Sequence, residues 1–244
     1  MIIDAVTFGG EIDLMRARLE VLPADQFVIV ESNKHYAGQP KSYLFEDNLE
    51  AFTKWLPKIE YVKIESLGSS SAWDNDYHQR RSVGTALEGL GLADDDTVCL
   101  FDADEFWDIE KLEPNVRAWR MPKYHMSLRW YHFDELTGLT GHWQHFKGQN
   151  VDAMRWIRES LPTIDGGFHL TSMGDLDYLI RKVKGFAHQE YNTAGLEDRL
   201  AHCWTYGHNL EGETFRELPD LSHLPDWFAL ETLPAEWYRK RPND

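Results

Sequence analysis

Cysteine is scarce in this chain of 244 residues, which contains only Cys99 and Cys203. Two cysteines exclude a framework of several disulfides and a zinc site built from cysteine clusters. No apolar run approaches the ~20 residues that a membrane-spanning helix needs. The first residues, Met1 to Phe8, have the pattern of a buried strand rather than that of a signal peptide. Together these absences predict a protein that works in a reducing, cytoplasmic setting.

Positive charge is also in short supply, because 25 Lys and Arg face 41 Asp and Glu and leave a net charge of −16. A nucleic-acid-binding surface uses Lys and Arg to neutralise phosphates, so this balance argues against a nucleic-acid partner. The same charge disfavours any phosphorylated ligand unless arginines or a metal ion offset it. A G-x-G-x-x-G fingerprint is absent as well, which gives dinucleotide binding little support.

Strand-like and helix-like spacings of apolar residues alternate through the first hundred positions. Short apolar runs predict strands at Ile2–Phe8, Phe27–Val30, Ile59–Ile64 and Thr97–Phe101. Apolar residues at helical spacing predict helices over 12–22, 45–55 and 73–90. This alternation is typical of an α/β fold with an open, mostly parallel sheet flanked by helices. The length of the chain fits a single domain.

The second half of the sequence is less regular. Its apolar patterns predict strands over 124–133, 151–158 and 181–188, and a helix over 195–208 that ends near Gly207. After residue 210, three Leu-Pro pairs begin at Leu218, Leu224 and Leu233. Proline interrupts long helices, so residues 211–244 are expected to form a strap packed on the domain formed by residues 1–210.

Three carboxylates, those of Asp102, Asp104 and Glu105, crowd the end of the fourth predicted strand. Two like charges about 4 Å apart repel by about 4 kcal/mol at an effective dielectric constant of 20, so something must offset the repulsion. Residues two apart on an extended chain point the same way, so both aspartates can face one Mg²⁺ or Mn²⁺ ion. A solvated acidic loop is the alternative. The position beyond the carboxyl end of a strand favours a ligand site.

Two histidines and two arginines are further candidates. His188 could complete a metal site based on aspartates, and His169 invites the same interpretation, although a lone histidine is often structural or exposed. Arg80 and Arg81 lie on the predicted helix before the acidic segment. Their guanidinium groups could grip a diphosphate or pair with the carboxylates. The alternative is that they are exposed helix charges.

Several short motifs follow one another in a recognisable order. They are VTFGGEIDL at Val6–Leu14, FVIVES at Phe27–Ser32, GQPK at Gly38–Lys41, FDADE at Phe101–Glu105, GGFH at Gly166–His169 and FAHQE at Phe186–Glu190. In this order the chain, from about Ile2 to about Gly207, resembles glycosyltransferase family 17. That family includes β-1,4-mannosyl-glycoprotein β-1,4-N-acetylglucosaminyltransferases. Phe101, Ala103 and Phe168 depart from the family pattern.

The resemblance implies a GT-A fold, a nucleotide-sugar donor (UDP-N-acetylglucosamine by analogy), a Mn²⁺ or Mg²⁺ ion and inversion at the anomeric carbon. The implied metal ligands are Asp102, Asp104 and His188. The implied nucleotide-binding residues are Phe8, Glu11, Glu31, Arg80, Arg81 and Asp102.

An inverting transfer also needs a carboxylate that takes the proton from the acceptor hydroxyl. The candidates in the second half of the chain are Asp165, Asp175, Asp177 and Glu190. Asp175 is preferred because it follows Gly174 in an expected loop.

Two other classes of function stay open at this point. A metal-dependent phosphohydrolase or nucleotidyltransferase could use the same aspartates, although no nucleophile motif accompanies them. A catalytically silent domain that binds a sugar or a nucleotide is the other alternative, and the intact set of Asp102, Asp104 and His188 counts against it. The sequence leaves the acceptor open between a glycan, a protein, a lipid and another small molecule.

Overall fold

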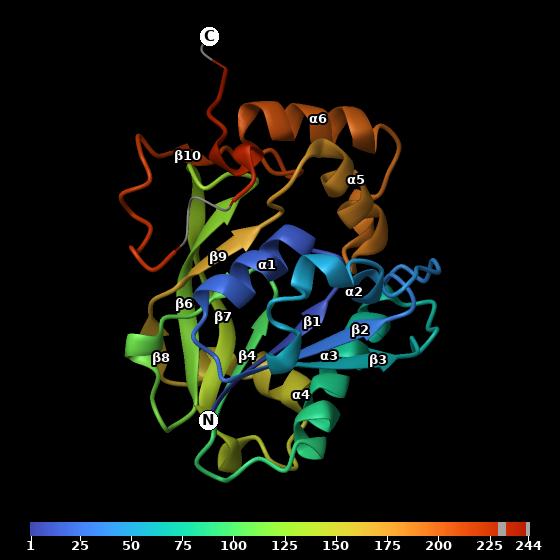
Figure 1. The fold of residues 1–244 in the computed structure, drawn as a ribbon. Helices are drawn as coiled ribbons and strands as arrows, with labels where there is room; N and C mark the ends of the chain where they lie inside the picture. The colour runs from blue at the N-terminus through green and yellow to red at the C-terminus, as the bar shows by residue number, and fades with distance from the viewer. Residues whose placement is uncertain (229–232, 243–244) are drawn as a thin grey trace.

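A ten-stranded mixed sheet forms the centre of the computed structural model, which describes residues 1–228 and 233–242 (Figure 1). The main path of neighbouring strands is β3-β2-β1-β4-β7-β6-β9-β5, with β10 paired to β7 and β8 paired to β6. The strands are β1 Ile2–Phe8, β2 Gln26–Ser32, β3 Ile59–Ile64, β4 Thr97–Asp102, β5 Glu105–Phe106, β6 Arg117–His125, β7 Trp130–His142, β8 Thr163–Asp165, β9 Phe168–Thr171 and β10 Arg216–Glu217.

The four strands predicted in the first half lie side by side and run parallel. In β1, Ala5 lies opposite Val28 of β2 and opposite Leu100 of β4. Each face of β1 is buried, with Ala5 in one apolar cluster and Val6 in another. Burial on both faces explains the near-continuous apolar runs of these strands. The predicted α/β class is confirmed, and beyond β4 the sheet becomes mixed.

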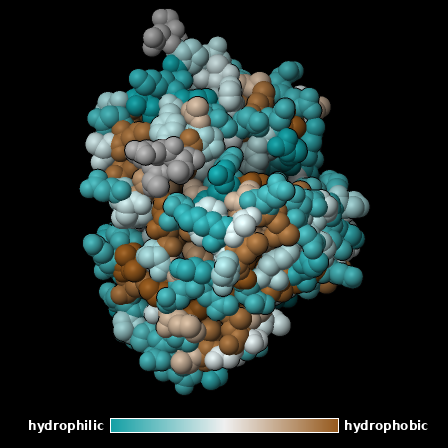
Figure 2. Space-filling model, in the orientation of Figure 1, coloured by the Kyte–Doolittle hydropathy of each residue, from teal (hydrophilic) through white to brown (hydrophobic). Residues whose placement is uncertain are grey.

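Helices cover both faces of this parallel half. Those on the two faces are α1 Ile12–Val21, α2 Leu44–Asp47, α3 Ala72–Gly89 and α4 Val151–Trp156, whereas α5 Leu176–Gly185 and α6 Leu196–Tyr206 pack on each other beyond this half (Figure 1). Leu14 of α1 belongs to the apolar cluster on one face, and Val83 of α3 and Val151 of α4 belong to the cluster on the other. In Figure 2 hydrophilic residues cover most of the visible surface, and the apolar residues that reach it lie in separate patches.

The helix predicted over 45–55 is broken into short pieces. After α2, two 3₁₀ turns follow at Leu49–Phe52 and Leu56–Lys58. The Asn48 side chain donates a hydrogen bond of 2.7 Å to the carbonyl oxygen of Leu44. That carbonyl would otherwise accept the helical bond of the Asn48 amide, so the side chain competes with the helix.

Two of the predicted strands in the second half are helical, and the predictions are wrong for a shared reason. Helix α4 replaces the strand over 151–158, and α5 replaces most of that over 181–188. Each begins at a capping side chain, since Asn150 accepts bonds from two amides of α4 and Asp175 accepts a 2.7 Å bond from the amide of Tyr178. Such caps satisfy amides that have no partner within the helix.

The strand predicted over 124–133 is also wrong as a single element. Strand β6 ends at His125 and β7 begins at Trp130, with Met126 between them at φ 63°. That left-handed conformation turns the chain and produces a hairpin. The helix predicted over 195–208 is confirmed as α6, which lies between Gly195 and Gly207, both in left-handed conformation.

The described part of the C-terminal segment packs on the same core. Strand β10 pairs with the start of β7, and Phe228 contacts Phe168 with ring centroids 4.7 Å apart. Leu224 and Trp237 are buried in the cluster that also contains Phe168. Residues 229–232 and 243–244 of the predicted strap lie outside the described residues.

A buried ion pair joins α1 to the middle of the sheet. Arg18 and Asp4 both have 0% of their surface exposed, and two nitrogens of the guanidinium lie 2.6 Å from the two carboxylate oxygens of Asp4. The indole nitrogen of Trp107 donates a further 2.8 Å bond to Asp4. The remaining guanidinium nitrogen of Arg18 donates to the carbonyl oxygens of Asp102 and Glu105. Arg18 therefore fixes the turn that carries the acidic segment.

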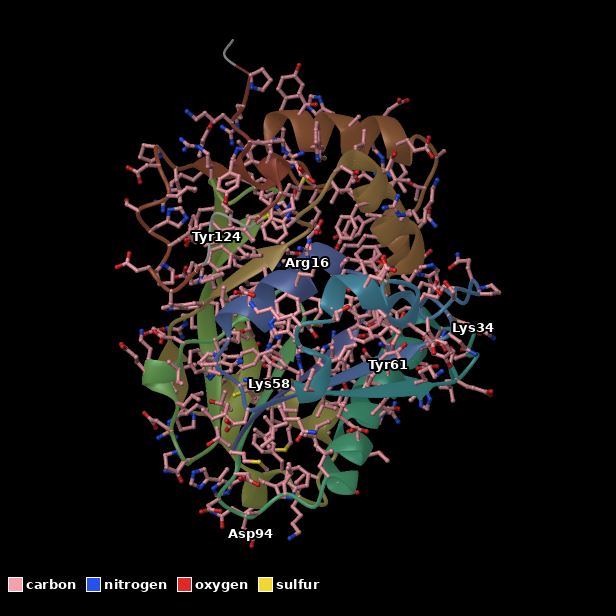
Figure 3. The ribbon with its side chains drawn as sticks, in the orientation of Figure 1. Arg16, Lys34, Lys58, Tyr61, Asp94 and Tyr124 are labelled. Carbon is pink, nitrogen blue, oxygen red and sulfur yellow. The ribbon has the colours of Figure 1, made fainter. Side chains whose placement is uncertain are left out.

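Arg18→Met is expected to lower the free energy of unfolding by about 3–5 kcal/mol, because it leaves the Asp4 carboxylate buried without its charge partner. Arg16→Met in the same helix is the control, since Arg16 is half exposed and lies 3.6 Å from Asp13 (Figure 3). An exposed pair of this kind contributes less than about 1 kcal/mol. Urea unfolding measures both, and equal losses would contradict the central role of Arg18.

Candidate functional site

A cavity of about 650 Å³ opens beyond the carboxyl ends of β1 and β4. Its volume lies within the range of about 300–1,000 Å³ that is typical of ligand sites. Gly9 to Glu11 after β1 and Asp102 to Asp104 after β4 form one part of its wall. Residues of α3, β6, β7, β9 and α5 also line it, together with the segments that follow β2, α5 and α6. The cavity thus lies where open α/β sheets bind ligands.

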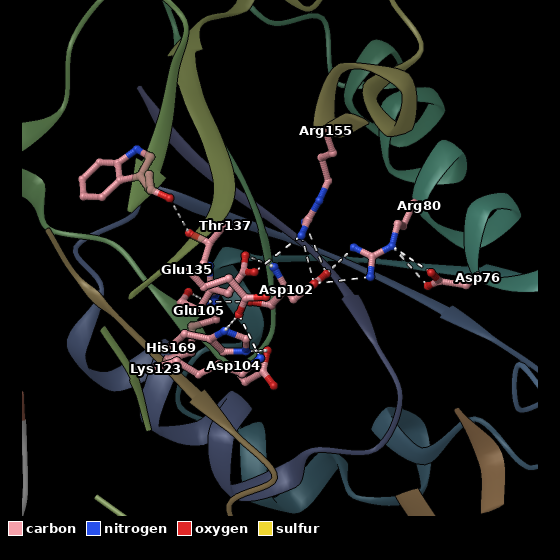
Figure 4. A network of polar contacts seen from close by, with 12 residues as sticks. Asp76, Arg80, Asp102, Asp104, Glu105, Lys123, Glu135, Thr137, Arg155 and His169 are labelled. Atoms are coloured by element: carbon pink, nitrogen blue, oxygen red, sulfur yellow. Dashed lines mark hydrogen bonds and ion pairs between the residues drawn. The ribbon is translucent and has the colours of Figure 1, made fainter. Parts of the chain in front are cut away.

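Two arginines from neighbouring helices bind the Asp102 carboxylate (Figure 4). Arg80 comes from α3 and Arg155 from α4, and each guanidinium donates to both carboxylate oxygens, with Arg155 Nη2 3.0 Å from Oδ2. Arg80 is itself oriented by Asp76, 3.1 Å from its Nε. Burial raises the pKa of Asp102, but Arg155 and Arg80 together lower it by more than burial raises it. The carboxyl group therefore stays ionised.

Asp104 faces a different pair of cations. Its Oδ1 lies 3.5 Å from Nε2 of His169, and its Oδ2 lies 3.5 Å from Nζ of Lys182. The other imidazole nitrogen of His169 lies 3.0 Å from Glu135, which also binds Lys123 at 3.0 Å. Positive and negative groups therefore alternate through the wall (Figure 4). These cations offset the repulsion expected between the crowded carboxylates.

The pKa values follow this alternation. Burial raises the pKa of Asp104, but His169 and Lys182 lower it more. Burial lowers the pKa of His169, whereas Asp104 and Glu135 raise it to about 9. His169 is therefore an imidazolium at neutral pH when no metal ion is bound to it.

His188, the third metal ligand expected from the sequence, is not brought next to Asp104. It lies on the cavity wall with its ring 4.5 Å from that of Trp73, and its Nδ1 is 2.6 Å from Glu190. Among the described residues there is no group of three or more His, Cys, Asp or Glu side chains arranged to hold a metal ion.

A smaller set of donors does fit a divalent cation. Asp104 Oδ1 and His169 Nε2 face each other at 3.5 Å on the cavity wall, and Glu135 holds the other nitrogen of the imidazole. A carboxylate behind the imidazole is the usual arrangement for a metal-binding histidine. Mg²⁺ sites commonly use one or two protein ligands and take the rest from water and substrate phosphates. The pair of Asp104 and His169 suits such a shared site.

The sequence did not decide whether His169 binds a metal ion, because its neighbours are brought to it by pairing across the sheet. In β9, His169 lies opposite Glu105 of β5 and opposite Lys123 of β6. Glu135 arrives from β7. No short-range pattern reveals this proximity.

The expected nucleotide-binding residues separate into two groups. Glu11 and Arg80 line the cavity, and so does Asp102. Glu11 accepts a 2.8 Å bond from the amide of Gly9, and burial raises its pKa. Phe8 is wholly buried in the core, and Arg81 is exposed on α3, where it donates to the carbonyl oxygen of Tyr77.

Glu31 has a different position from that expected. It is buried, and its carboxylate accepts bonds from the amides of Leu44 and Phe45 at 2.7 and 3.0 Å. It also binds the hydroxyl of Tyr61, labelled in Figure 3, and the ammonium of Lys41. With these partners Glu31 anchors the segment before α2 to the sheet, and it is not among the residues that line the cavity.

The four carboxylates considered as the base are not among the lining residues, although Glu190 pairs with His188, which is one of them. Asp177 is exposed on α5. Asp165 is 79% exposed at the end of β8, Asp175 caps α5, and Glu190 is 57% exposed and paired with His188. The lining residues do include other carboxylates that sequence reasoning did not select, Asp76, Glu211 and Glu213.

Charge is distributed unevenly between the cavity and the rest of the molecule. The wall holds six Lys or Arg residues and six Asp or Glu residues, whereas the whole chain has 25 and 41. The cations are Lys34, Lys41, Arg80, Lys123, Arg181 and Lys182. The wall of the cavity is therefore nearly neutral in a strongly acidic protein, which reduces the repulsion that an anionic ligand would meet.

A family model described as Glycosyltransferase family 17 matches residues 1–192 of the 244-residue chain. The chain belongs to glycosyltransferase family 17. The resemblance read from its motifs is confirmed, and membership supports a glycosyltransferase that uses a sugar donor and an acceptor. No curated protein matches this family 17 chain. Within the part of the chain that the structure describes, no helix is long and apolar enough to span a membrane.

The stability of this family 17 protein is expected to fall between pH 6.5 and about 9. The pKa of His169 is about 9 in the folded state and about 6.5 in the unfolded state, so its stabilisation is complete below pH 6.5 and is lost as the pH rises through 9. Urea unfolding across this range measures the slope.

His169→Asn should flatten this slope, because the variant has no titrating imidazole between Asp104 and Glu135. His78→Asn on α3 is the control, since the ring of His78 lies 3.2 Å from a carbonyl oxygen, that of Glu65. Equal slopes for the two variants would overturn the charge assignment.

Proposed function

We propose that this chain is a metal-dependent, inverting glycosyltransferase that moves N-acetylglucosamine from a UDP-sugar to a hydroxyl group of an acceptor. The donor sugar and the GT-A organisation are taken by analogy with family 17. The observation that carries the proposal is the position of Asp102 and Asp104. Asp102 is the last residue of β4 and Asp104 lies in the turn after it, both in the wall of the large cavity and beside cations from α3, α4 and α5.

The donor would bind at the loop after β1. Gly10 has φ +112°, and a Cβ built there would lie 2.5 Å from the Leu44 side chain, so only glycine suits this position. A glycine loop lets a ligand approach the backbone closely. Asp102 keeps the guanidinium of Arg80 at the wall, where its charge would favour a diphosphate.

Asp104 and His169 would hold Mn²⁺ or Mg²⁺, with Glu135 keeping the imidazole in position. When bound, the ion would neutralise charge that develops on the departing diphosphate. The binding of a cation by His169 requires loss of its proton. Lys182 beside Asp104 would contribute further positive charge at the same point.

Thermal unfolding with UDP-N-acetylglucosamine and Mn²⁺ tests this assignment. The wild-type melting temperature is expected to rise only when both are present, and Asp104→Asn and His169→Ala should each remove the rise because a protein ligand of the ion is lost. His188→Ala is the matched control and should retain it. If His188→Ala loses the rise and His169→Ala retains it, His188 is the metal ligand, as expected from the sequence, and His169 is not.

The acceptor hydroxyl needs a base within hydrogen-bond reach. Asp165→Asn, Asp175→Asn and Glu190→Gln are each expected to retain kcat within about threefold, because none of these carboxylates is among the residues that line the cavity. Asparagine also preserves the cap of α5. UDP release with an active acceptor provides the measurement. A loss of about 10²-fold or more in any one variant would identify it as the base, as general-base catalysis contributes that much.

A further inference from the structure

The cavity continues well past the proposed donor position. Strand β7 pairs with β4 as far as Leu139 and Leu100, and the same register, continued by two residues, would bring Thr137 opposite Asp102. His132, on the same strand and also on the cavity wall, is five residues further along. Five residues of strand span roughly 16 Å. The cavity therefore has room for a second ligand beyond the proposed site of the diphosphate.

The far end is built by the loop that follows α6, residues 209–213, which we call the acidic loop. Asn209 is buried and organises it, since its side-chain oxygen Oδ1 accepts bonds of 3.1 and 2.8 Å from the backbone amides of Glu211 and Glu213. Its amide nitrogen donates to the carboxylate of each, at 3.3 and 2.7 Å. Both glutamates thereby belong to the cavity lining.

Neighbouring elements fix the orientation of the acidic loop. His132 of β7 lies 2.9 Å from Oε2 of Glu213, and the hydroxyl of Tyr191 donates to Glu211. An antiparallel bridge between His208 and Thr214 closes the base of the loop. Each carboxylate is thus held by partners of the chain on one side and remains exposed on the other.

The acidic loop lies beyond the part of the chain that matches the family. The match ends at residue 192, so it includes Gly9 to Glu11, Asp102 to Asp104 and Lys182 but not residues 209–213. The proposed donor end of the cavity is therefore made of family-matched sequence, and at the far end the acidic loop is the part that lies outside the match. This distribution is expected if the donor is bound by sequence that the family shares and the acceptor is chosen by sequence outside the match.

We propose that the acidic loop forms the acceptor subsite and selects a saccharide without negative charge. The inference rests on the proposed function, since it places the acceptor across the cavity from the donor. Carboxylates only accept hydrogen bonds when ionised, so Glu211 and Glu213 suit the hydroxyl groups of a sugar and repel an anionic one. Phe133 on the same wall is 42% exposed and offers an aromatic surface for a sugar ring.

Binding of p-nitrophenyl glycosides tests the subsite without a donor. The β-glucoside and the β-glucuronide differ only in a neutral or a carboxylate group at C6, and the α-mannoside and N-acetyl-β-glucosaminide extend the neutral set. Saturation-transfer NMR should show that at least one neutral glycoside binds about tenfold or more tightly than the glucuronide. In the Glu211→Gln/Glu213→Gln variant that ratio should fall below about threefold, because the repulsion is gone.

Glu197→Gln is the matched control, because Glu197 is an exposed glutamate of α6 that pairs with Lys184 at 2.7 Å and is not among the lining residues. It should keep the wild-type ratio. Calorimetric titration with UDP-N-acetylglucosamine and Mn²⁺ should give the same affinity in all three proteins.

Two results separate the failure of this inference from failure of the proposed function. A wild-type protein that binds the UDP-sugar but prefers no neutral glycoside, or a double variant with an unchanged ratio, overturns the acceptor assignment alone. Selective glycoside binding without any binding of the UDP-sugar overturns the proposed donor and supports the saccharide subsite.

Discussion

The buried guanidinium of Arg18 is the contact on which the arrangement of the acidic segment depends. A charge without water must be matched by partners, and Arg18 finds them in the Asp4 carboxylate and the carbonyl oxygens of Asp102 and Glu105. Helix α1, strand β1 and the turn after β4 are thereby joined at one point. Arg18 thus helps to position the carboxylate of Asp104, although Arg18 does not itself line the cavity.

Around that fixed turn, the chain balances its own charges. Arg80 and Arg155 face Asp102, while His169 and Lys182 face Asp104. These cations come from three helices and one strand, so their convergence is a product of tertiary structure. A protein with a net charge of −16 can in this way present a wall that tolerates a diphosphate.

The parallel half could be predicted from sequence because its signals are local, namely apolar runs with helical spacing between them. In the second half, the residues of 151–158 and 181–188 also alternate in hydrophobicity, which predicted strands. The capping residues before α4 and α5 favour a helix at each place instead. The segment FDADE lies at the end of a strand, as its apolar lead-in predicted, and Asp102 and Asp104 line the cavity. The meeting of His169 with Glu135 depends on pairing between distant strands, and neighbouring residues carry no trace of it.

Strand β7 has thirteen residues and is paired with β4, β6 and β10. It supplies Glu135 beside the charged centre and His132 beside the loop after α6. One strand therefore carries residues of both regions. Any two ligands bound there would be held at a separation fixed by the number of strand residues between Glu135 and His132.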